Sequence, residues 1–130
     1  HGEKPRILQF DNEKEELSAI KELIAIYQVS AYKSLGIVCK TESQAREMAD
    51  KLQIPAIHFL SSQSSAFLLG IVITSAHMAK GLEFDEVIIP QVDDRNYHSE
   101  IDRSMLYVAV TRAMHRLTLT YSGTKHTPFI

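Results

Sequence analysis

Strand-like and helix-like patterns alternate along this chain of 130 residues. Apolar residues recur at helical spacing after Asp11 or Asn12, after Thr41 and after Ser99, which are all residues of the kind that cap helices. The patterns predict helices over residues 13–27, 42–52 and 100–113, strands over residues 6–10, 35–39, 56–60, 70–74, 86–90 and 116–121, and a polar loop over residues 61–65. Because parallel strands need crossover connections, the alternation predicts a three-layer α/β domain with a mainly parallel sheet.

The composition is that of an ordinary soluble domain. Apolar residues make up 45% of the sequence and charged residues 23%, so we expect one domain over residues 1–130 with a sizeable core. The net charge of -2 provides no overall field for nucleic acid, so any such contact needs a local basic patch. The single cysteine, Cys39, excludes an internal disulfide and fits the reducing cytoplasm. The longest apolar run, residues 66–73, is broken by Gly70 and is too short to span a membrane.

A loop over residues 75–84 carries side chains that suit a nucleotide. Ligands of open α/β sheets lie beyond the carboxyl ends of the strands, and this loop leaves such an end. Gly81 allows a backbone conformation that is closed to other residues, and Lys80 adds a positive charge beside it. Glu83 can accept from sugar hydroxyls, and His77 lies on the same loop.

Arg112 lies on the expected third helix, from which its guanidinium could reach the same crevice. A planar fork with five donors matches phosphate oxygens well. Simpler interpretations remain open from spacing alone. The loop can be a surface turn fastened by Leu82 and Phe84, and Arg112 can be a solvated or salt-bridged side chain.

A group of acidic and histidine residues follows the fifth expected strand, but its spacing fits no metal site. A polar loop with a helix cap explains these residues better, so no metal ligand is assigned. The group consists of Asp93, Asp94, His98, Glu100 and Asp102.

Two longer motifs resemble a known family. Residues 73–85, Ile-Thr-Ser-Ala-His-Met-Ala-Lys-Gly-Leu-Glu-Phe-Asp, resemble motif V of UvrD/Rep-type superfamily 1 helicases. Residues 106–117, Leu-Tyr-Val-Ala-Val-Thr-Arg-Ala-Met-His-Arg-Leu, look like motif VI of the same family. Residues 40–46 are similar to the segment that follows a Tyr-Arg pair in these helicases, with Cys39-Lys40 in the place of that pair.

The resemblance implies a RecA-like (P-loop NTPase-like) fold and the C-terminal part of the second motor domain (2A), with ATP held between two RecA-like domains. By position, Arg112 is the expected catalytic residue, an arginine finger that reaches the γ-phosphate. Gly81 and Glu83 are expected to bind the nucleotide as well, with Glu83 on the ribose. The expected coupling residues between the nucleotide and single-stranded DNA are His77, Lys80 and Thr111, and Tyr107 joins Thr111 in positioning the motif VI helix.

Two parts of such a motor do not occur in this sequence. No Gly-x-x-x-x-Gly-Lys-Ser/Thr run is present to hold the β- and γ-phosphates, and no Asp-Glu pair follows a strand to hold Mg²⁺. We expect both on an N-terminal RecA-like domain of the same protein. The 130 residues are therefore expected to be a fragment of a larger protein and to hydrolyse no ATP alone.

Three functions remain open. The first is an ATP-dependent DNA helicase or translocase, in a setting such as DNA repair, with this chain as one motor half. The second is a HelD-like (helicase IV-like) motor that acts on RNA polymerase, because residues 93–101 and 123–129 look most like that branch. The third is a RecA-like interaction module without catalysis, and the presence of Gly81, Glu83 and Arg112 argues against it.

Overall fold

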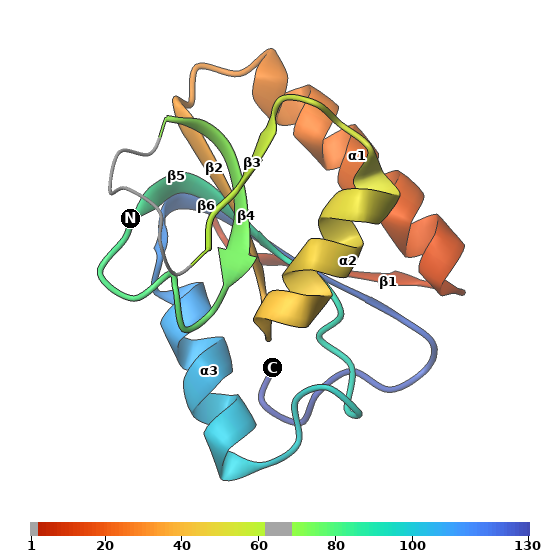
Figure 1. Ribbon diagram of the computed structural model, residues 1–130. Helices are drawn as coiled ribbons and strands as arrows, with labels where there is room; N and C mark the ends of the chain where they lie inside the picture. Colours follow the sequence, from red (N-terminus) through yellow and green to blue (C-terminus); the bar gives the residue numbers. More distant parts are fainter. Residues whose placement is uncertain (1–2, 62–68) are drawn as a thin grey trace.

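The computed structural model describes residues 3–61 and 69–130, which form one six-stranded sheet flanked by three helices (Figure 1). The strands lie in the order β1-β6-β5-β2-β4-β3, and each pair of neighbours is parallel. The strands are β1 (Arg6–Phe10), β2 (Ser34–Cys39), β3 (Ile57–Phe59), β4 (Gly70–Ser75), β5 (Phe84–Ile89) and β6 (Ala113–Ser122). The helices are α1 (Glu13–Gln28), α2 (Glu42–Leu52) and α3 (Glu100–Val110).

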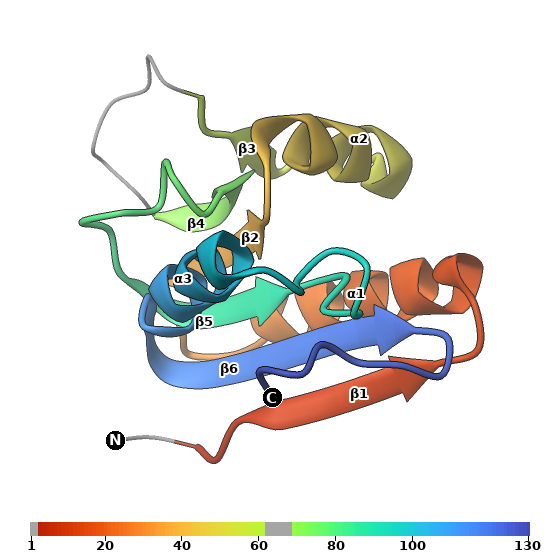
Figure 2. The same cartoon turned by 90° about the horizontal axis from the view of Figure 1, so that it is seen from below.

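The helices cover both faces of the sheet, which confirms the three-layer α/β prediction. On one face, α1 and α2 share a buried apolar cluster with β2 and β4, to which Ile20 and Met48 belong. On the other face, α3 shares a second cluster with β5 and β6, to which Leu106 and Leu119 belong. Figure 2 shows α1 and α3 on opposite sides of the β5–β6 part of the sheet.

The helix starts follow local capping chemistry, as the sequence predicts. The Asn12 side chain accepts from the backbone N–H of Glu15 at 2.9 Å, which caps α1. Thr41 and Ser99 each form a capping box, in which the side chain three residues later bonds back to the cap. Each of these caps uses only residues within one helical turn, so the sequence alone is enough to place them.

The end of α3 differs from the prediction. The helix stops at Val110 instead of residue 113, and β6 begins at Ala113 instead of residue 116, so Arg112 lies in the turn between them. The Thr111 hydroxyl turns back onto the helix, and the Arg112 carbonyl accepts from the Phe84 N–H at 2.9 Å, which starts the pairing of β5 with β6. This pairing joins residues far apart in sequence, so helical periodicity could not reveal it.

The end of the loop before β5 is fixed by one aromatic side chain. Phe84 is fully buried, and its ring occupies the space beside Gly36 of β2, where an added Cβ would lie 2.5 Å from a ring atom. Gly36 is therefore required by the close approach of Phe84. The strand boundaries otherwise differ from the predictions by one or two residues, and most of the predicted polar loop over residues 61–65 lies outside the described residues.

Candidate functional site

The predicted nucleotide-binding loop over residues 75–84 runs from one edge of the sheet to the other. It leaves β4 after Ser75, at the carboxyl edge, and enters β5 at Phe84, at the amino edge, because β4 and β5 point the same way. Ala76 and Ala79 are buried in the apolar cluster under α3, which holds the turn against the sheet. The loop leaves a carboxyl end, as the sequence predicts, but its last residue, Glu83, lies at the amino edge.

Arg112 and Glu83 lie together at the amino edge. Each immediately precedes the first residue of its strand, and those first residues, Ala113 and Phe84, pair with each other. The Arg112 Nη1 donates to the carbonyl of Leu82 at 3.2 Å, so the guanidinium touches the residue next to Glu83. The structure thus brings the predicted guanidinium and carboxylate to the same edge, although not to the crevice expected for them.

The Arg112 guanidinium is held in place before any ligand arrives. Its Nε donates to the Val108 carbonyl at 3.1 Å, and its Nη2 donates to the Thr111 hydroxyl at 3.2 Å. The side chain is partly buried. Glu83, in contrast, is exposed, and no hydrogen-bond or ion-pair partner for it occurs among residues 3–61 and 69–130.

Gly81 has the special backbone conformation that the sequence predicts. Its φ angle is +81°, in the region that residues with side chains rarely adopt, while an added Cβ would meet no atom within 4 Å. The requirement for glycine is therefore conformational and not one of space. Leu82 follows this bend directly, and its carbonyl accepts from Arg112.

His77 and Lys80 precede Glu83 in the loop and lie on the side that faces α3. Both are exposed and line a hollow of about 270 Å³ between the turn and α3, together with Ala76, Ile101, Ser104, Met105 and Val108. Ile101 is 74% exposed, so this hollow has an apolar rim beside its two basic side chains. Val108 connects the hollow to the amino edge, since its carbonyl accepts from Arg112.

Thr111 and Tyr107 contact each other through the backbone. The Thr111 N–H and hydroxyl both donate to the Tyr107 carbonyl, at 3.1 and 3.0 Å. The Tyr107 side chain itself is 69% exposed. The two residues are therefore joined through the Tyr107 carbonyl, while the Tyr107 ring lies on the surface.

Lys40 forms an ion pair that sequence reasoning missed. Its ammonium lies 2.9 Å from Asp102 Oδ1, and it also lies 5.9 Å from the ring centre of Tyr97. Burial alone would raise the pKa of Asp102, but the bond from Lys40 and the N–H groups of His98 and Ser99 hold it well below its ordinary value. Lys40 thus ties the end of β2 to the start of α3.

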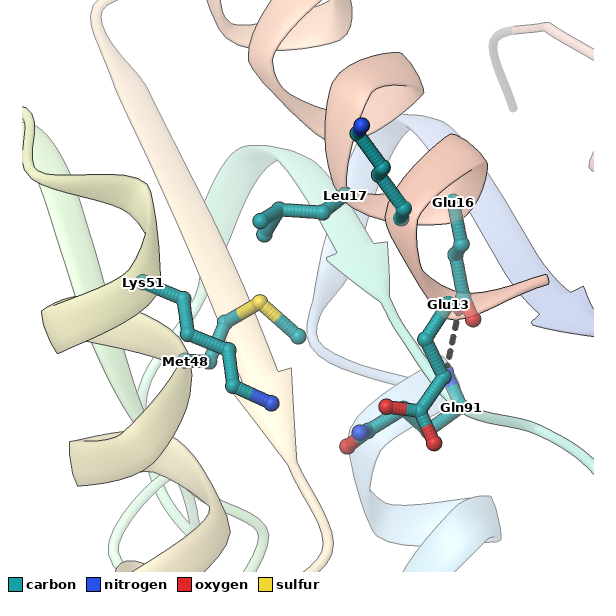
Figure 3. Close-up of a pocket in the computed structure, with 7 residues that line it drawn as sticks. Glu13, Glu16, Leu17, Met48, Lys51 and Gln91 are labelled. Atoms are coloured by element: carbon teal, nitrogen blue, oxygen red, sulfur yellow. Dashed lines mark hydrogen bonds between the residues drawn. The ribbon is translucent and has the colours of Figure 1, made fainter.

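Glu16 is a second carboxylate that the sequence did not single out. It is 3% exposed, and its Oε2 accepts from the Thr120 hydroxyl at 2.6 Å and the Gln91 N–H at 2.9 Å. Burial raises its pKa above the usual 4.5. Figure 3 shows Glu16 at the wall of a pocket of about 360 Å³ between α1 and α2, into which Met48 and Lys51 project. Its partners are 75 and 104 residues away in sequence, so no local signal could have found them.

The acidic group after β5 has structural partners. Asp93 accepts from the N–H groups of Arg95 and Asn96, and Asp102 completes the capping box of α3. Across the part of the chain that the structure describes, no three His, Cys, Asp or Glu side chains are placed to hold a metal ion. None of the helices in that part is long and apolar enough to cross a membrane.

Comparisons with known proteins agree on the kind of domain. Residues 70–120 match the family described as UvrD-like helicase C-terminal domain. DNA helicase II of Escherichia coli (strain K12) is 34% identical over 73 residues, covering 48% of this chain and 10% of that protein. The Gabija protein GajB of Bacillus cereus (strain VD045) is 41% identical over 58 residues, covering 45% of this chain and 12% of that protein.

The fold is also found among solved structures. The C-terminal domain of a possible DNA helicase from Lactobacillus plantarum WCFS1 has a TM-score of 0.86 to this chain at 24% identity, and the match covers 99% of this chain and 80% of that one. This likeness establishes the helicase C-terminal fold over nearly the whole chain. The matched part of the chain spans only about a tenth of the length of the curated relatives.

Proposed function

Because this chain is a UvrD-like helicase C-terminal domain, we propose that it is the second RecA-like half of an ATP-driven DNA helicase or translocase. The observation that carries the proposal is the meeting of Arg112 and the Leu82–Glu83 segment at one edge of the sheet. A guanidinium and a carboxylate at one edge can contact the phosphate end and the sugar end of one nucleotide. We propose that the protein acts in the cytoplasm, in a process such as DNA repair.

The residues at the amino edge fit a nucleoside triphosphate. Arg112 retains N–H groups beyond its internal bonds, and these would donate to γ-phosphate oxygens. Glu83 is exposed and would accept from the ribose hydroxyls, while the bend at Gly81 sets the spacing between the two. ATP supplies the phosphoryl group whose transfer to water drives motion, and Arg112 would stabilise the charge that develops during that transfer.

The other wall of this site would come from a different domain. The sequence has no phosphate-binding Gly-x-x-x-x-Gly-Lys-Ser/Thr run, so an N-terminal RecA-like domain would supply it together with the Mg²⁺ ligands. His77 and Lys80 lie on the same turn as Glu83, and we propose that they contact single-stranded DNA through the hollow beside α3. A change in the conformation of this turn would then affect both the nucleotide and the single-stranded DNA. Thr111 would contribute to this coupling through its bond to Arg112.

The test is the ATPase activity of the full-length protein with and without single-stranded DNA. We expect Arg112→Ala to lower the DNA-stimulated kcat by about 10³–10⁵-fold, the range for arginine fingers. Arg103→Ala is the matched control, because the exposed Arg103 side chain contacts Glu100 at 3.8 Å and the Phe129 ring at 5.8 Å instead of the residues around Arg112. The control should keep wild-type activity, and both variants should melt within a few degrees of the wild type.

The same experiment separates the other candidate functions. An Arg112→Ala protein with unchanged ATPase activity would overturn the proposal. An absence of any ATPase activity in the full-length wild type would favour an interaction module without catalysis. ATPase activity that responds to RNA polymerase and not to single-stranded DNA would favour a HelD-like motor.

A further inference from the structure

The Arg112 guanidinium has a fixed number of donors, and the structure accounts for part of them. A guanidinium carries five N–H groups, one on Nε and two on each terminal nitrogen. Within the described residues, Nε donates to Val108, Nη1 to Leu82 and Nη2 to Thr111, one bond each. One N–H therefore remains on each terminal nitrogen. Two such donors form the fork that bonds a phosphate or carboxylate in a bidentate manner.

Two of the three acceptors are backbone carbonyls whose places are set by the fold. Val108 belongs to the last turn of α3, and Leu82 follows the bend at Gly81. These two carbonyls fix Nε and Nη1, but the plane of the guanidinium also needs a third point on the Nη2 side. The only side chain that supplies it among the described residues is Thr111.

The Thr111 hydroxyl is itself oriented by the helix. Its single proton is shared between the carbonyls of Tyr107 and Val108, each 3.0 Å away. Since the proton points back into the helix, the lone pairs of the oxygen face outward, toward Arg112 Nη2. The orientation of the guanidinium is thus set by α3 through the Thr111 hydroxyl.

We propose that Thr111 is a positioning residue for Arg112, whose hydroxyl orients the guanidinium so that its two remaining N–H groups face the phosphoryl group of a bound nucleotide. The inference rests on the proposed function of Arg112 and adds a second residue to it. An oriented donor costs little reorganisation when charge develops on the phosphate. Loss of the hydroxyl should therefore weaken binding of the transition state more than binding of the nucleotide.

The experiment uses the full-length protein and compares Thr111→Val with Thr111→Ser. Valine keeps the branched shape without the hydroxyl, and serine keeps the hydroxyl. We expect Thr111→Val to lower kcat about tenfold with KM within about twofold, and to weaken binding of ADP with aluminium fluoride about tenfold with ADP binding unchanged. Thr111→Ser should stay within about threefold of the wild type in every measurement. Thr124→Val, at an exposed position in the tail, is the control and should match the wild type.

Arg112→Ala is measured in the same assays, to separate failure of the positioning role of Thr111 from failure of the proposed function of Arg112. Loss of activity in Arg112→Ala with wild-type behaviour of Thr111→Val would overturn the positioning role alone. Wild-type activity in Arg112→Ala would overturn the proposed function and the positioning role with it. Should Thr111→Val fail to fold, Thr111→Ala against Thr111→Ser gives the same comparison, and equal kcat values in those two variants would also overturn the inference.

Discussion

The two ends of α3 use their charged residues in opposite ways. At the start of the helix, Asp102 accepts from Lys40 and from the N–H groups of His98 and Ser99, so both of its oxygens are occupied. At the other end, Arg112 keeps two N–H groups beyond its three internal bonds. The exposed Glu83 beside it has no partner among the described residues.

The difference shows why a count of charges does not locate a functional site. The segment over residues 93–102 has the denser group of ionisable residues, yet its two buried carboxylates are engaged internally. Asp93 closes a turn, and Asp102 completes the capping box of α3 and pairs with Lys40. The turn at the end of α3 has fewer charges, but they retain capacity for another molecule. We therefore expect substitutions at the first end to change stability, and substitutions at the second end to change ligand binding.

The strongest test of this comparison is Asp102→Ala at the start of α3. It removes the Asp102 half of the capping box and leaves the Lys40 ammonium and two backbone N–H groups without their acceptor. We expect a loss of about 2–3 kcal/mol in the free energy of unfolding at pH 7, measured by urea denaturation of this chain. The loss should be this large because the Asp102 side chain is 8% exposed.

The effect of Asp102→Ala should depend on pH with a definite sign. The pKa of Asp102 is lowered in the folded state, so its contribution is complete above the ordinary value of 3.8 and is lost as the pH falls below it. The difference between variant and wild type should therefore shrink between pH 5 and pH 2, roughly the window of a strongly lowered carboxyl pKa. A difference that stays constant over that range would contradict the assignment of the ion pair.

The sequence predicts the parts of this molecule that depend on neighbours in the chain. The caps at Thr41 and Ser99 and the bend at Gly81 are local, and each is confirmed. The prediction placed Arg112 on α3, but the helix ends at Val110 and Arg112 lies in the turn after it. The end of α3 depends on the pairing of Arg112 with Phe84, 28 residues earlier in the sequence, which no local pattern reveals. The roles of Glu83 and Arg112 came from family resemblance and stay predictions until ligand binding is measured.

A smaller effect is expected from Glu83→Gln at the open end of α3. The amide cannot replace the carboxylate as an acceptor for two sugar hydroxyls, so the full-length protein should bind ATP about tenfold more weakly, as expected for loss of one charge-assisted hydrogen bond. Binding of 2′,3′-dideoxy-ATP, which lacks those hydroxyls, should be equally weak in the variant and the wild type. Unfolding of the variant should be unchanged, because Glu83 is exposed.

The control for Glu83→Gln is Glu47→Gln, an exposed glutamate on α2 with the same change of charge. It should leave ATP binding as in the wild type. Equal weakening of ATP and the dideoxy compound by Glu83→Gln would show that Glu83 acts through general charge and does not contact the ribose.

The smallest effect is expected from Glu16→Gln, which adds a third kind of carboxylate to the comparison, one that is buried but paired only with neutral donors. Its folded-state pKa is raised above 4.5, so the folded state binds the proton more tightly, and stability falls as the pH rises from about 4.5 through the raised value. Glutamine keeps an oxygen for the Thr120 hydroxyl and the Gln91 N–H without the buried charge.

We therefore expect Glu16→Gln to stabilise this chain by up to about 1 kcal/mol at pH 7, and to remove the fall in stability that ionisation of Glu16 is expected to cause above pH 4.5. Glu22→Gln, an exposed change on the same helix, should stay within about 0.5 kcal/mol of the wild type. A clear loss of stability in Glu16→Gln at pH 7 would mean that the two donors favour the ionised carboxylate by more than burial opposes it. Glu16 would then belong with Asp102, as a charge whose internal bonds outweigh its loss of water.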